Sequence, residues 1–369
     1  MNRSVKNQAW LTLALLVLFF ILILLAQFPL LAEWFTISLA PLYFFFFQVV
    51  LGWLPFSITE LVWGALILST LVTIIHKIRK KAHLSSWAWV MIPWLMLPNS
   101  FMISSGMAYQ RPPLQLFNET LSKEPDQFVS LVNAALLDFN AVSEALVFDE
   151  KGSVTNPYDW TTLNRLLNDQ FHFLSIPELH TFSVLAKPMT FSWLYTEFQI
   201  TGMYFSPLGE VLINTNIPDA LIPFTIAHEM AHAKGVMREQ DANLIAMYVC
   251  LTSNDPFLRY SGYFNTFYAL LNLLRYVGDD QAYGRAYQQL SLEIRNDFRY
   301  QGTFWAQYTL LDDLARWVND VYLRIMGNEG VTSYVDVPTT GTVVENGQTI
   351  EVITQFSPYQ QLYFYLFNL

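Results

Sequence analysis

Two histidines and a glutamate in one short segment carry the most specific chemistry in the chain. They form the run His228-Glu229-Met230-Ala231-His232. On a helix, a spacing of four places both imidazoles on one face, one turn apart, where they can occupy two corners of a zinc tetrahedron. Glu229 lies about 100° around the same helix, so its carboxylate can reach a water at the metal and act as general base. The flanking residues are apolar or small, so we expect this helix to be buried.

The HExxH motif alone does not establish a zinc site, because a chain with six histidines can contain it by chance. A third ligand at a suitable spacing is therefore needed to support the prediction. Gly235 is expected to end the helix and to turn the chain back towards the metal. Glu239 is the favoured third ligand, and it leaves one position open for water, which is typical of a catalytic zinc site. Asp241 is the alternative, but it lies two residues further along the same helix and is expected to point elsewhere.

The remaining histidines of the polar region and the single cysteine are predicted to be structural. His172 and His180 are eight residues apart and lack the spacing of metal ligands. Cys250 lies in an apolar run and is interpreted as a small buried hydrophobic residue. With one cysteine, no internal disulfide can form.

The composition predicts a membrane anchor followed by an acidic folded domain. Hydrophobic residues make up 53% of the chain and charged residues only 14%, whereas soluble proteins carry about 25% charged residues. Residues 1–111 contain seven Lys/Arg against two acidic residues, whereas residues 112–369 contain thirteen against twenty-eight, a net charge of −15. Such an acidic domain is a poor candidate for nucleic-acid binding, which requires a cationic surface.

Residues 1–111 are predicted to form the anchor, with transmembrane helices at about 9–32, 58–76 and 86–107 and an interfacial segment at about 34–55. The cationic run 76–81 should stay on the cytoplasmic side with the N-terminus. This topology places the domain formed by residues 112–369 outside the cytoplasm. The expected partner of the anchor is therefore the lipid bilayer.

The fold class predicted for the whole chain is membrane-anchored and mainly α with a small β element (α+β). A strand is expected at 210–214, and the Thr/Val-rich tail with Asn346-Gly347 predicts a hairpin. Helices are expected at 121–146, 161–173, 222–234, 239–252, 261–277 and 279–326, the last interrupted near Gly302.

The motif region resembles a known family. The block His228-Glu229-x-x-His232-x-x-Gly235-x-x-x-Glu239-x-x-Ala242-Asn243 is similar to bacterial multi-pass membrane proteins of the zincin (MA) metallopeptidase clan, described as a domain of unknown function. Further similar patches are Tyr109-x-Arg111-x-Pro113 and Gly202 to Pro207. The Glu-x-x-Ala-Asn run also resembles the Glu-x-x-Ala-Asp run of membrane-embedded gluzincins, in which the Glu is the third zinc ligand. Asn243 replaces that Asp.

The resemblance implies zinc and a zincin-like metallopeptidase domain in a bacterial cell membrane. We therefore expect a zinc-dependent peptidase acting on a peptide or protein in the cell envelope, with Glu229 as general base. Strand 210–214 is expected at the edge that pairs with an extended peptide, and Tyr204 and Asn214 are weak candidates for substrate contact. Two alternatives stay open: a membrane zincin-like sensor, and an inactive zinc-binding envelope protein.

Overall fold

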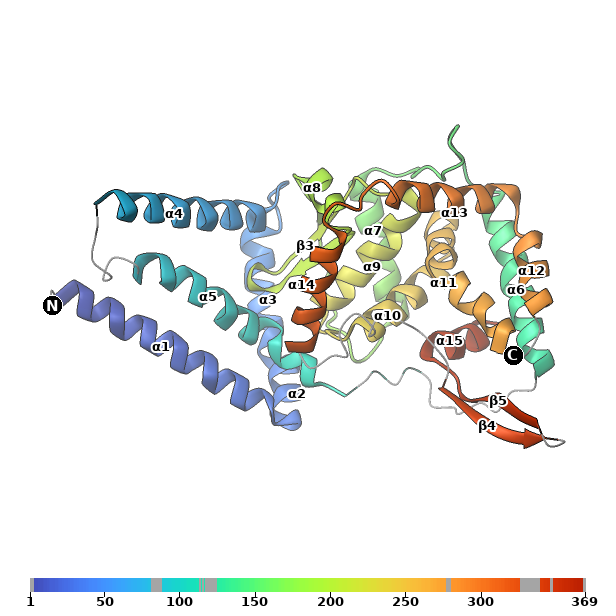
Figure 1. Cartoon of the computed structure of the whole chain (residues 1–369), viewed down its shortest axis with the longest axis horizontal. Coiled ribbons are helices and arrows are strands. Elements are labelled where there is room, and N and C mark those ends of the chain that lie inside the picture. The colour runs from blue at the N-terminus through green and yellow to red at the C-terminus, as the bar shows by residue number, and fades with distance from the viewer. Residues whose placement is uncertain are drawn as a thin grey trace.

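The computed structural model describes residues 3–80, 88–112, 114, 116, 125–276, 280–325, 339–345 and 348–367. Within these ranges the chain is mostly helical, with one three-stranded sheet and one two-stranded hairpin. Figure 1 shows that the N-terminal helices extend to one side of a larger helical body that contains both sheets.

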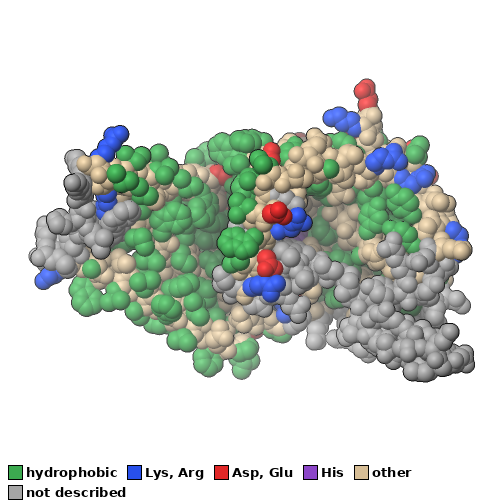
Figure 2. Space-filling view, viewed as in Figure 1, with side chains coloured by type: hydrophobic (Ala, Val, Ile, Leu, Met, Phe, Trp, Pro, Cys, Tyr) green, Lys and Arg blue, Asp and Glu red, His purple; other side chains and the backbone are tan. Residues whose placement is uncertain are grey.

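The N-terminal part contains five helices: α1 (Arg3–Ala26), α2 (Pro29–Ser38), α3 (Ala40–Leu51), α4 (Ile58–Lys80) and α5 (Ala88–Ser104). By length and composition, three stretches of the described residues could cross a membrane, and the space-filling view shows their apolar surface (Figure 2): Lys6–Ala26, Pro29–Gln48 and Ile58–Arg79. The apolar helix Val90–Ser104 is shorter. The protein therefore has N-terminal helices suited to membrane anchoring.

The stretch predicted to be interfacial is broken into α2 and α3 at Leu39, and prolines occupy the first turn of each helix. By length and composition alone it is also a candidate span. In Figure 1, however, α2 and α3 run across the ends of α1, α4 and α5 that face the body. α2 contacts α1 and the short 3₁₀ helix η2 (Gly106–Gln110), and α3 contacts α5.

The sheet is small, and the strand at 210–213 does not lie at its edge as expected. β1 (Ala186–Pro188) pairs parallel with β3 (Glu210–Ile213), and β2 (Gly202–Phe205) pairs antiparallel with β3 on the other side. β3 is thus the central strand, and all four of its residues are buried. The prediction that 210–214 forms the exposed edge was wrong, because both of its edges are hydrogen-bonded within the sheet. The edge strands of the sheet are β1 and β2.

The helices of the body surround an apolar core in which α9 (Ile222–Ala233), α10 (Glu239–Leu251) and α11 (Pro256–Tyr276) pack against one another and α6 (Pro125–Ser143) packs on α11.

The tail forms the expected antiparallel hairpin of β4 (Thr339–Glu345) and β5 (Gln348–Gln355), and its Asn346-Gly347 turn lies outside the described residues. The remaining elements are α7 (Trp160–Leu174), α8 (Ser192–Glu197), η3 (Ser206–Leu208), η4 (Asp219–Leu221), α12 (Asp280–Gln289), α13 (Leu292–Trp305), α14 (Asp312–Ile325) and α15 (Pro358–Leu366).

The long helix expected at 279–326 is three helices, so it has two breaks and not one. Gly302 lies in the last turn of α13, and the break predicted near it follows Trp305. One break falls at Ser291, whose side chain accepts a hydrogen bond from the backbone N–H of Ile294 and caps α13. The other falls between Trp305 and Asp312.

Buried polar contacts join the N-terminal helices to the sheet. The Glu210 carboxylate on β3 accepts hydrogen bonds from the backbone N–H groups of Ile58 (3.2 Å) and Thr59 (2.7 Å), where α4 begins. It also pairs with Lys187 of β1 at 2.7 Å. Glu60 accepts hydrogen bonds from the backbone N–H groups of residues 190 and 191. The anchor is therefore fixed to the body by its own helix termini.

Candidate metal centre

Helix α9 presents the histidine motif from inside the core. Pro223 occupies its first turn, where a missing N–H costs nothing. Nearly every residue of α9 is buried, because the helix packs against β2 and β3 on one side and against α10 and α11 on others. His228, Glu229 and His232 are thereby held by a rigid element rather than by a loop.

A tight turn after α9 orients the second histidine. Gly235 adopts φ of +99°, a left-handed conformation that favours glycine. A Cβ on this residue would also lie 2.9 Å from Nε2 of His180, so the His180 ring leaves no room for a side chain at position 235. The turn returns the Val236 carbonyl to Nδ1 of His232 at 2.6 Å. Since a carbonyl can only accept, Nδ1 carries the proton, and Nε2 is directed towards α10.

The two imidazoles converge with Glu239, the first residue of α10. Oε2 of Glu239 lies 3.2 Å from Nε2 of His228 and 3.5 Å from Nε2 of His232. Among the described residues these three side chains form a group whose ligand atoms all lie within 4.8 Å of one another. Their side chains are 8–12% exposed. Nδ1 of His228 is buried and has no hydrogen-bond partner in the part of the chain that the structure describes.

Asp241, the alternative ligand, is directed elsewhere. Its carboxylate accepts from the backbone N–H of Leu114 at 3.2 Å and lies 3.6 Å from Nε of Arg238. Burial raises the pKa of Asp241, and these partners oppose the rise. The structure therefore brings Glu239, and not Asp241, to the two histidines.

Strong electrostatic coupling follows from the burial of these groups together. Burial disfavours the charged imidazolium, but the facing carboxylates of Glu239 and Glu229 outweigh it and raise the pKa of His232 to about 9. Burial alone would raise the pKa of Glu239 too, but the imidazoles hold it well below its usual range. Without a bound cation the cluster thus holds a proton in the metal's place, so metal and protons should compete for it.

Glu229 lies on a different side of α9, beside strand β2. A Cβ on Gly202 would lie 2.8 Å from both Cγ and Oε1 of Glu229, so only a glycine leaves the carboxylate this position. Burial raises the pKa of Glu229, while the two histidines and a hydrogen bond from the Tyr204 backbone lower it in part. The carboxyl is therefore poised to hold a proton at higher pH than an exposed glutamate.

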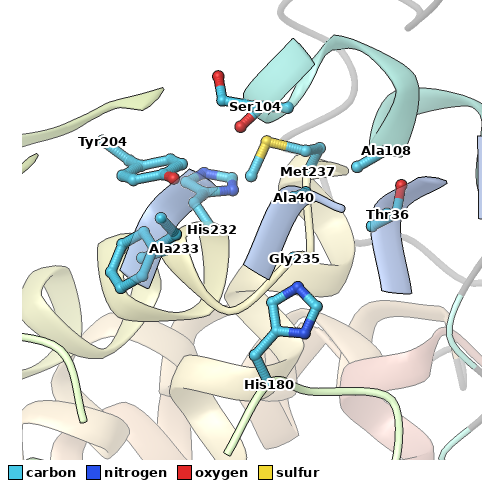
Figure 3. A pocket seen from close by; sticks show the side chains of 12 residues that line it. Thr36, Ala40, Ser104, Ala108, His180, Tyr204, His232, Ala233, Gly235 and Met237 are labelled. Carbon is cyan, nitrogen blue, oxygen red and sulfur yellow. The ribbon is translucent and has the colours of Figure 1, made fainter. Parts of the chain in front are cut away.

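Tyr204 lies next to the cluster, and its surroundings come from the membrane part. A cavity of about 10 Å³ beside Tyr204 and His232 is lined on its other sides by residues of α2, α3, α5 and η2 (Figure 3): Thr36, Ala40, Phe44, Ser104, Ser105 and Ala108. Burial raises the pKa of the Tyr204 hydroxyl, which bonds to the Ser105 side chain. The cavity admits little more than one water.

The other predicted or neighbouring polar residues serve the scaffold. The Asn214 amide donates to Oγ1 of Thr196 (3.0 Å) and to the carbonyl of Ile200 (2.8 Å), and its Oδ1 accepts from the N–H of Asn216. Asn214 is thus not brought to the histidines. His172 is exposed and lies 3.2 Å from Oγ of Ser183.

His180 is more closely connected to the cluster than the sequence suggested. Its ring packs against Gly235, as Figure 3 shows. Burial, followed by the charges of Arg111 and Lys234, lowers the pKa of His180 to about 4, so it is neutral at neutral pH. Arg111 itself donates to the carbonyl of Gly235 at 3.0 Å. The sequence named Gly202, Arg111 and His180 but gave none of them a role at this site, because their contacts are with residues of other elements.

These features define a mostly helical protein whose apolar N-terminal helices adjoin a buried His-His-Glu cluster. The chain belongs to the family described as protein of unknown function (DUF3810), which matches residues 35–339. No curated protein and no solved structure matches it. The match agrees with the resemblance to a domain of unknown function, whereas the relationship to zincin peptidases stays a prediction.

Proposed function

We propose that this protein is a membrane-anchored, zinc-dependent peptidase with a zincin-like domain. His228, His232 and Glu239 would hold the zinc ion, and Glu229 would be the general base. The substrate would be a peptide or protein of the cell envelope. The membrane would be a bacterial cell membrane.

The separation of the ligand atoms carries the proposal. Two ligands at about 2.1 Å from one zinc ion, at a tetrahedral angle, lie about 3.4 Å apart. The Glu239 oxygen lies 3.2 and 3.5 Å from the two imidazole nitrogens. Two neutral imidazoles and one carboxylate are also the donor set of catalytic zinc sites in peptidases, in which one position stays open.

Zinc held by such a set acts as a Lewis acid and supports hydrolysis by water at neutral pH. The chain's own contribution is the placement of the Glu229 carboxylate, which would take a proton from the attacking water and return it to the leaving amine. Its burial favours this exchange, because a raised pKa makes the carboxylate a stronger base towards water and brings the pKa of the group closer to neutral pH, where one side chain can both accept and return a proton. The closed surroundings exclude bulk water from the reacting groups.

Strand β2 offers a peptide-binding edge beside this carboxylate. The N–H of Asn214 donates to the carbonyl of Thr201 at 2.8 Å, which fixes that pair as hydrogen-bonded. Antiparallel pairs alternate, so the next such pair is Met203 with Leu212, and the N–H and C=O groups of Gly202 and Tyr204 point away from β3. The Tyr204 N–H already donates to the Glu229 carboxylate. An extended substrate could hydrogen-bond to the N–H and C=O of Gly202 and to the C=O of Tyr204, one strand away from the position first expected.

Metal analysis of the purified full-length protein tests the ligand set. We expect about one zinc per chain, lost in His228→Ala and Glu239→Ala and retained in Asp241→Ala. Glu229→Gln should also retain zinc, because the amide keeps the shape of the side chain, and it should lower the rate of peptide hydrolysis by about 10²–10⁴-fold. Zinc lost from Glu229→Gln as readily as from His228→Ala would contradict the role given to Glu229.

We also propose that the body lies outside the cytoplasm, as the cationic run at the end of α4 suggests. Cys250 is fully buried, so introduced cysteines can be labelled over a low background. In intact cells a membrane-impermeant thiol reagent should label Lys151→Cys but not Arg79→Cys. The reverse pattern would invert the topology.

A further inference from the structure

The membrane part of the chain covers the His232 side of the candidate metal centre. The cavity beside His232 has side walls from α2, α3, α5 and η2, and its volume of about 10 Å³ leaves no room for a peptide. On this side of the cluster, a substrate can reach His232 only where these elements meet the body. The route to the site is consequently determined by where α2 and α3 lie.

Helices α2 and α3 have two unlike faces. The face towards the body contains the small buried residues Thr36 and Ala40, which share a cavity with His232. The opposite face exposes large apolar side chains, including those of Trp34, Ile37, Leu42, Phe45 and Phe46. α2 and α3 run across the ends of the candidate spans (Figure 1), and exposed apolar side chains cover this part of the molecule (Figure 2). Such a face is suited to lie in the bilayer interface, where tryptophan is enriched.

The proposed peptide-binding edge is bounded by the same helices. The Tyr204 ring lies 6.3 Å from the Phe44 ring of α3, and the Phe205 ring lies 5.9 Å from the Trp63 ring of α4. The hydroxyl of Tyr43 donates to the carbonyl of Pro207 at 2.7 Å, just beyond β2. A peptide added to β2 would thus lie between the body and helices that face the bilayer.

We infer that the substrate is a polypeptide segment that directly flanks a transmembrane helix of a membrane protein. This inference rests on the proposed peptidase function and specifies its substrate class. A segment tethered to its own span already lies at the bilayer surface, beside α2 and α3, whereas a folded soluble protein has no access to β2. Only one helix layer, about 10 Å thick, separates the site from the apolar surface. Cleavage should therefore fall within about ten residues of the end of the span, a reach of about 33 Å when extended.

Proteoliposomes that contain the full-length protein and defined probe peptides test this inference. Each probe has a leucine-rich span of about 20 residues followed by about 30 residues of randomised sequence, and a matched set contains the randomised part alone. Product ends are mapped by mass spectrometry, and Glu229→Gln protein is the control for cleavage by other proteases. We expect tethered probes to be cleaved faster, on the order of 10²-fold, because tethering raises their effective concentration. Their cleavage sites should cluster near the span.

Equal cleavage of free and tethered probes, or sites spread evenly along the randomised part, would overturn the inference and leave the peptidase function standing. Cleavage that does not differ between wild-type and Glu229→Gln protein would overturn both. Metal content of the same preparations separates that result from loss of zinc.

Discussion

Replacement of Gly202 by alanine tests the position of the proposed general base without altering any proposed metal ligand. The new Cβ would lie 2.6 Å from Cγ2 of Thr225 and 2.8 Å from Cγ and Oε1 of Glu229. Carbon atoms in ordinary contact are about 3.5–4.0 Å apart, so strand β2 and the Glu229 side chain must separate by about 1 Å. Overpacking of this size costs about 1–3 kcal/mol of stability, and a misplacement of about 1 Å costs about 10² in rate.

The assay compares three readouts on the same preparations: the thermal unfolding temperature, the zinc content and the rate of cleavage of the tethered probes. Zinc should be retained. Gly302→Ala is the matched control, because nothing lies within 4 Å of its Cβ position on α13, and it should raise stability by about 0.5–1 kcal/mol. Adding Thr225→Ser removes the 2.6 Å contact but not those to Glu229, so stability should recover in part while the rate stays low. Equal rates for the Gly202 and Gly302 variants would refute the reasoning.

Two predictions concern stability. Lys187→Met should lower the free energy of unfolding by about 3 kcal/mol, because it leaves the buried Glu210 carboxylate without its cation. The control Arg165→Met removes the cation of an exposed pair and should cost less than about 1 kcal/mol. Similar losses from both variants would show that burial of the pair is unimportant. Burial raises the pKa of Asp297 from 3.8 to about 6, so Asp297 stays protonated to a higher pH in the folded state than in the unfolded state. The free energy of unfolding should then fall by about 3 kcal/mol as the pH rises from about 4 to about 6, and level off above pH 6. Thermal unfolding followed as a function of pH should not show this fall in Asp297→Asn. A variant with the same pH profile as the wild type would contradict the prediction.

The sequence predicted the parts of the site that depend on local spacing. Two histidines four residues apart must share a helix face, and a glycine three residues later makes a left-handed turn cheap. The position of Glu239 follows from that short turn, so its approach to both imidazoles agrees with the expectation. The same local logic found the central strand and the C-terminal hairpin.

The sequence did not reveal contacts between distant segments. Strand order was one such failure: β1 pairs with β3 across 25 residues in sequence, as in the register Ala186 with Val211, and nothing in a short alternating segment indicates which of its edges will be covered. Likewise Lys187 and Glu210 pair across 23 residues, and Glu210 also bonds to the start of α4, more than 100 residues away. Each of these residues looks like an ordinary charged side chain in its local sequence.

Arg111 shows why the membrane part contributes more than attachment. Its guanidinium donates to both oxygens of Glu33 on α2, at 2.7 and 3.0 Å, and to the carbonyl of Gly235. Gly235 adopts a left-handed conformation with φ of +99°, and the next residue, Val236, supplies the carbonyl that fixes Nδ1 of His232. A continuous series of contacts therefore extends from α2 to one of the proposed zinc ligands. A helix that only tethered the body would need no such connection, so the anchor forms part of the candidate metal centre itself.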